Sequence, residues 1–142
     1  MRILGIDHGE KRIGVAVSDP TEQIATGVGV IGSAGDTRKD IDEIKKVMSK
    51  FGDVGEIVVG LPKTMKGEIG QRAQIVLNFI DALKAEVSIP VLSWDERLST
   101  VAVERVLIEA DMSRAKRKKV IDKSAAVYLL QGYLDAKGSR NR

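Results

Sequence analysis

The sequence contains no cysteine and one histidine, His8, in 142 residues. The lack of cysteine excludes a disulfide framework, a thiolate zinc site and a cysteine nucleophile. A single histidine also makes a histidine-rich metal site untenable and leaves one candidate base for a serine triad. No segment approaches the ~20 consecutive apolar residues that a membrane span needs, and the N-terminus enters a strand pattern directly, unlike a signal peptide. These absences predict a cytoplasmic protein with no membrane partner.

The length of the chain predicts one domain over residues 1–142, since domains commonly run to roughly 100–200 residues. Its net charge of +3 conceals an uneven distribution: residues 1–110 carry 14 Lys and Arg against 17 Asp and Glu, whereas residues 111–142 carry nine against three. Residues 111–121 are predicted to form a basic loop and residues 138–142 a short basic tail. The cations of this loop are Arg114, Lys116, Arg117, Lys118 and Lys119. Such a run often contacts phosphate, although a solvated loop has the same composition.

Hydrophobic periodicity predicts three strands followed by alternating strands and helices. Apolar runs over residues 2–7, 12–18 and 24–31 predict the strands, with a hairpin turn between the first two. The rest of the chain is predicted to form a helix capped by Asp36, a strand over 55–61, a helix over 70–84, a strand over 90–95, a helix from Ser99 or Thr100, and a last helix over about 122–137. This order predicts an α/β fold with a mixed five-stranded sheet, its first three strands antiparallel, flanked by helices.

Acidic residues at three places are candidates for chemistry. Asp7 ends an apolar strand, where a carboxylate needs a cation, a donor or a metal, although a role in turning the hairpin is the simpler alternative. Asp95 and Glu96 end another strand and point to opposite faces, so the pattern alone does not say which of them meets Asp7. Asp122 lies four residues before Ala126 on the apolar stripe of the last helix, and is expected to face the sheet unless it serves only as a helix cap.

These carboxylates could converge at one edge of the sheet. Oxygen ligands without histidine or cysteine favour Mg²⁺ or Mn²⁺ over zinc. Two such ions ~3.5–4 Å apart can activate a water molecule and stabilise the leaving oxygen of a phosphodiester. The pattern therefore predicts metal-dependent cleavage of nucleic acid, with the basic loop helping to hold the anionic substrate.

Four blocks of the sequence resemble the YqgF family and follow one another in the family's order. They are LGIDHG with KRIGVA and SD over residues 4–19, GLP with Met65, Gly67 and Gly70 over residues 60–70, DERLST over residues 95–100, and DKSAA followed by LQ over residues 122–131. The chain departs from the family at Gly27, Val28 and Gly29, where a Pro-Leu pair is expected, and this leaves the bounds of the third strand open.

The resemblance implies an RNase H-like fold related to the RuvC resolvases, and a nuclease that processes the 5′ end of pre-16S rRNA in ribosome biogenesis. It also implies that the metal ligands are Asp7, Glu96 and Asp122. The resemblance thus assigns the role of ligand to Glu96 and not to Asp95. Contacts to structured RNA are expected from cations in and near the family blocks and from the basic loop, namely Lys11, Arg12, Arg97, Arg114, Lys116, Arg117, Lys118 and Lys119.

Three other functions are consistent with parts of the pattern. A Holliday junction resolvase acting on branched DNA would need a homodimer that places two sites on one junction, and the sequence leaves the oligomeric state open. An ATP-binding module of the actin and sugar-kinase type also has a strand Asp followed by Gly in a hairpin, but it needs two domains, for which 142 residues are too few. A non-catalytic RNA-binding factor would use the basic end alone.

Overall fold

The computed structural model describes residues 1–64, 66–96 and 114–140, and the side chains of its last helix over residues 125–138. Its elements are β1 (Arg2–His8), β2 (Arg12–Ser18), β3 (Ala25–Gly32), α1 (Thr37–Ser49), β4 (Val54–Leu61), α2 (Gln71–Glu86), β5 (Val91–Asp95) and α4 (Arg114–Arg140). The strands and the first two helices lie close to the predicted bounds, and Asp36 caps α1 by accepting the backbone N–H groups of Arg38 and Lys39. The helix predicted from Ser99 or Thr100 lies outside the described residues.

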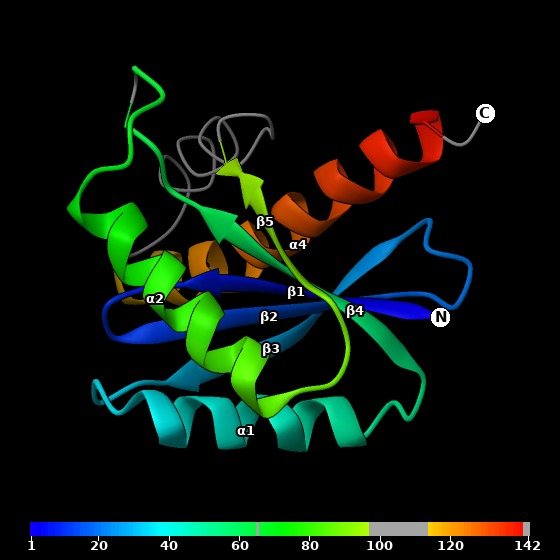
Figure 1. Cartoon of the computed structure of the whole chain (residues 1–142), viewed down its shortest axis with the longest axis horizontal. Coiled ribbons are helices and arrows are strands. Elements are labelled where there is room, and N and C mark those ends of the chain that lie inside the picture. Colours follow the sequence, from blue (N-terminus) through cyan, green and yellow to red (C-terminus); the bar gives the residue numbers. More distant parts are fainter. Residues whose placement is uncertain (65, 97–113, 141–142) are drawn as a thin grey trace.

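The five strands form one sheet in the order β3-β2-β1-β4-β5. β2 pairs antiparallel with β1 and with β3, whereas β4 pairs parallel with β1 and with β5. Figure 1 shows α1 and α2 on one side of this sheet and α4 across the other. Both faces of β1 and β4 are therefore covered, which explains why their sequences read as nearly continuous apolar runs. The predicted mixed sheet with three antiparallel strands is confirmed.

The hydrophobic core is divided by the sheet into two layers. Alternate residues of β1 and β4 face α1 and α2, where they pack with apolar residues such as Ile44 and Leu83. The intervening residues face α4 and pack with Ala126 and Leu130. A Cβ atom on Gly5 would lie 2.8 Å from Leu130 Cβ, so the close approach of α4 to β1 depends on glycine at this position.

The predicted start of the last helix is wrong. α4 begins at Arg114 rather than near residue 122, so the basic run from Arg114 to Lys119 occupies the first two turns of a helix and not a loop. The run lacks the apolar spacing by which helices were identified, but alanine, arginine and lysine have high intrinsic helix propensity. Gly138 and Arg140 of the predicted basic tail also lie in α4. None of the described helices is long and apolar enough to cross a membrane.

Candidate active site

Asp7 lies near the end of β1 and faces α4. Ile3 packs in the layer beneath α4 and Gly5 lies against Leu130, so the alternation of the strand puts the Asp7 side chain on the same face. Asp7 is only 9% exposed. A carboxylate buried to this extent is costly unless donors or a cation compensate its charge. The strand therefore presents a carboxylate in a setting where a positive partner has a large effect.

Glu96 follows β5 directly, and its carboxylate lies over Gly60 of β4. A Cβ atom on Gly60 would lie 2.7 Å from Glu96 Oε1 and 3.0 Å from Leu129 Cδ2, so the Glu96 carboxylate lies on the face covered by α4. Ile6 of β1 pairs with Val59 of β4, and the next step along both strands places Asp7 beside Gly60. Because neighbouring strands are about 4.8 Å apart, Asp7 and the backbone beneath Glu96 are close neighbours on one face of the sheet.

Asp95 points to the opposite face. It pairs with Leu61, which packs in the layer beneath α1 and α2, and its Oδ2 lies 4.0 Å from Lys63 Nζ. Trp94, one residue earlier, packs on the α4 side, as the alternation of β5 requires. Of the two neighbouring acids, the structure thus places Glu96 on the face that carries Asp7.

Asp122 lies in α4, and its side chain is outside the described part of the helix. Leu130 lies over Gly5, and Figure 1 shows α4 beginning at the end of the sheet where β1 finishes, so the Asp122 backbone, eight residues before Leu130, lies toward that end. Within the part of the chain whose side chains are described, no three Asp, Glu, His or Cys residues form a group suited to a metal ion. Two of the three predicted ligands therefore share a face, and only the backbone of the third is located.

The predicted nucleic-acid contacts fall into two groups. Lys11 is exposed in the turn between β1 and β2, and Arg12 is half-buried at the start of β2, at the end of β1 that carries Asp7. The five cations of the basic run lie in the first two turns of α4, without described side chains, and Arg97 lies outside the described residues. Figure 1 shows that α4 begins at the end of the sheet where β1 finishes. The basic run and the two candidate carboxylates therefore lie toward the same end of the fold.

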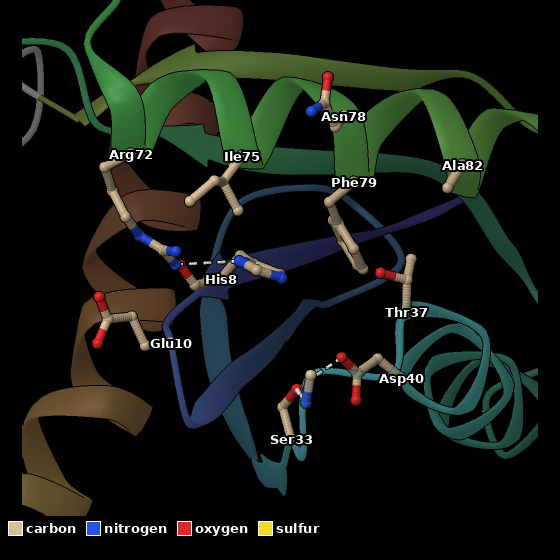
Figure 2. Close-up of a pocket in the computed structure, with 11 residues that line it drawn as sticks. His8, Glu10, Ser33, Thr37, Asp40, Arg72, Ile75, Asn78, Phe79 and Ala82 are labelled. Atoms are coloured by element: carbon tan, nitrogen blue, oxygen red, sulfur yellow. Dashed lines mark hydrogen bonds between the residues drawn. The ribbon is translucent and has the colours of Figure 1, made fainter.

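A pocket of about 570 Å³ lies on the other face of the same strand end, between the start of α1 and the face of α2 from Arg72 to Ala82. Figure 2 shows His8, which follows Asp7, pointing into this pocket, with its ring 4.5 Å from that of Phe79. His8 Nδ1 lies 3.0 Å from Arg72 Nη2. A guanidinium group can only donate, so Nδ1 accepts and the proton of the neutral ring is on Nε2. Arg72 was not identified from the sequence, because one arginine at a helix start forms no recognisable pattern.

Burial, and next the Arg72 guanidinium, lower the pKa of His8 from its ordinary value of 6.5. The unfolded chain therefore binds a proton at His8 more readily than the folded protein does. The free energy of unfolding should fall as the pH drops below 6.5, and it should be unaffected by His8 at higher pH. Nitrogen NMR of the only histidine measures both the pKa and the tautomer. We expect Arg72→Ala to raise the pKa and Arg38→Ala, at an exposed position on α1, to leave it unchanged. Equal His8 pKa values in wild type and Arg72→Ala would contradict the contact.

Known proteins resemble this chain over nearly its whole length. The family model described as "RuvX: Holliday junction resolvase" matches residues 1–136. A protein of Thermoanaerobacter pseudethanolicus is 51% identical over 141 residues, which cover 99% of this chain and 100% of the relative. A protein of Clostridium novyi is 48% identical over 136 residues, covering 96% and 99%. Both relatives are named "Putative pre-16S rRNA nuclease".

Two solved structures share the fold over nearly the whole chain. Thermus thermophilus RuvC in complex with a Holliday junction substrate matches with a TM-score of 0.59 and 15% identity, covering 98% of this chain and 97% of RuvC. Fowlpox virus resolvase in complex with Holliday junction DNA matches with a TM-score of 0.53 and 14% identity, covering 96% and 99%. At these identities the likeness concerns the fold alone, and it confirms the predicted RNase H-like architecture.

Proposed function

Because the chain belongs to the RuvX (YqgF) family and is therefore a nuclease that hydrolyses phosphodiester bonds, we propose that Asp7, Glu96 and Asp122 form its metal-binding active site. The observation that carries this proposal is the position of the Glu96 carboxylate over Gly60, on the face where Asp7 lies one strand away. Asp122 would be the third ligand. Leu130 of α4 lies over Gly5, and the earlier part of α4, which includes Asp122, lies toward the end of β1 that carries Asp7.

The donor set fits Mg²⁺ or Mn²⁺, which prefer oxygen ligands. When bound, a pair of such ions would activate the attacking water and stabilise the leaving oxygen. The chain contributes the placement of the ligands: Asp7 comes from the central strand, with neighbours on both sides, and Glu96 comes from the end of β5. Asp7, on this central strand, is therefore held more precisely than a ligand on a long loop would be. Asp7 is buried, and a bound cation there would offset the cost of desolvating its carboxylate.

We further propose that the substrate is the 5′ end of pre-16S rRNA, cleaved in the cytoplasm. The RNA substrate is supported by the relatives of about 50% identity over nearly the whole chain, which are named "Putative pre-16S rRNA nuclease". Lys11, Arg12 and the cations of the basic run at the start of α4 would hold the RNA phosphates. A second candidate, the resolution of branched DNA, is favoured by the description of the family model, and would require a homodimer with paired sites.

Cleavage of the two substrate classes by the same preparation tests this proposal. The purified protein is incubated with an end-labelled pre-16S rRNA fragment, a four-way DNA junction and the matching linear duplex, each with Mg²⁺, Mn²⁺ or EDTA. We expect cuts in the RNA with either metal and none with EDTA, because the proposed site has only carboxylate ligands. Paired symmetric cuts in the junction, with intact RNA and a dimer in sedimentation, would assign the resolvase function instead. Cleavage that survives EDTA would argue against the metal site.

A further inference from the structure

In the described sheet, no backbone N–H group is positioned to donate a hydrogen bond to the carbonyl oxygen of His8. Gly9 N–H donates to Arg12 O at 2.8 Å, so by antiparallel alternation the polar groups of His8 point away from β2 and toward β4. The pairing of β1 with β4 ends at Ile6 and Val59. Two further steps in this register would bring the His8 carbonyl to the N–H of residue 62. That residue is Pro62, which has no N–H.

Arg72 provides the missing donor from another element. It is the second residue of α2, and its Nη2 atom donates to the carbonyl oxygen of His8 as well as to Nδ1 of the ring. Figure 2 shows the guanidinium reaching from the start of the helix to His8. Both contacts are made to one residue, by one nitrogen, so they fix the backbone and the side chain of His8 together.

These contacts extend the constrained part of β1 past Asp7. On the β4 side the last residue held by strand pairing is Ile6, immediately before Asp7, and the residue held by Arg72 is His8, immediately after it. A strand end that lacks a partner on one side can twist or fray. We propose that Arg72 is a positioning residue: by replacing the donor that Pro62 lacks, it holds the end of β1 so that the Asp7 carboxylate stays aimed at the metal site on the opposite face.

This inference rests on the proposed role of Asp7 as a metal ligand, so the test measures metal binding without substrate. The Mn²⁺ affinity of the purified protein is measured by calorimetry for wild type, Arg72→Ala, Arg72→Lys and Arg38→Ala. We expect Arg72→Ala to weaken Mn²⁺ binding about 10–100-fold, the range typical of residues that orient metal ligands without contacting the metal. Arg72→Lys should lose less, since its ammonium can still donate to the carbonyl, and Arg38→Ala should match wild type.

Chemical rescue separates positioning from a general loss of structure. Methylguanidinium at low millimolar concentration should restore much of the Mn²⁺ affinity of Arg72→Ala and leave that of wild type unchanged. Unchanged affinity in both Arg72 variants, or a loss that follows a lowered Tm and is not rescued, would overturn the positioning role. Asp7→Asn keeps the two proposals apart. If it also binds Mn²⁺ as wild type does, the metal site itself is misassigned, whereas loss in Asp7→Asn alone refutes only the role of Arg72.

Discussion

Asp7→Asn is expected to lower the rate of RNA cleavage about a thousandfold or more, while leaving the fold and the binding of RNA largely intact. A metal ion can contribute several kcal/mol of transition-state stabilisation, and about 4 kcal/mol corresponds to a factor of a thousand. The amide has nearly the same shape as the carboxylate but lacks the charge that a divalent ion requires. Single-turnover cleavage and an RNA-binding titration on the same preparation measure the two effects separately.

Asp95→Asn is the matched control for this variant. Asp95 adjoins Glu96 in sequence, but it points to the other face of the sheet and lies near Lys63. Its loss should change cleavage only a few-fold. Comparable cleavage by Asp7→Asn and wild type would refute the metal-site assignment, and RNA binding without cleavage in all three proteins would support a non-catalytic RNA-binding factor.

The fold could be predicted because most of its elements have a clear hydrophobic period. β1 is a nearly continuous apolar run that ends at turn residues, β2 alternates, and α1 carries a capping residue and an apolar stripe, so their bounds follow from local rules. The start of α4 could not be predicted in this way. Its first two turns contain a run of cations with no apolar stripe, and the period that identifies helices is absent there even though the backbone is helical.

The candidate site could be predicted in part. Periodicity indicated Asp7 and Asp122, but it left Asp95 and Glu96 equivalent, and only the family resemblance chose between them. The Glu96 carboxylate lies over Gly60, which belongs to a different strand. Arg72 and His8 are 64 residues apart in the chain. Their contact depends on a strand register and on the missing N–H of Pro62, and such long-range geometry leaves no local pattern in a sequence.

Gly60→Ala is expected to lower cleavage and Mn²⁺ affinity about 10–100-fold, as changes in residues that support a metal ligand commonly do. The added Cβ would lie 2.7 Å from Glu96 Oε1, well inside contact distance, and 3.0 Å from Cδ2 of Leu129, a buried residue of α4. The clash of the added methyl group therefore cannot be relieved by movement toward α4, because the side chains between α4 and the sheet are already closely packed. Glu96 lies just past the end of β5 and is the part that can move, so its carboxylate should be displaced.

Two further variants identify the cause of this effect. Gly29→Ala on β3 adds the same methyl group where no atom of the described residues lies within 4 Å, and should behave as wild type. Glu96→Asp shortens the side chain and withdraws the carboxylate from Gly60, so it should reduce activity by itself but make Gly60→Ala less harmful when the two are combined. Cleavage rates and Mn²⁺ affinities of wild type, Gly60→Ala, Glu96→Asp and the double variant give this coupling directly. Fully additive losses, or wild-type affinity in Gly60→Ala, would mean that Glu96 does not depend on the bare backbone of Gly60.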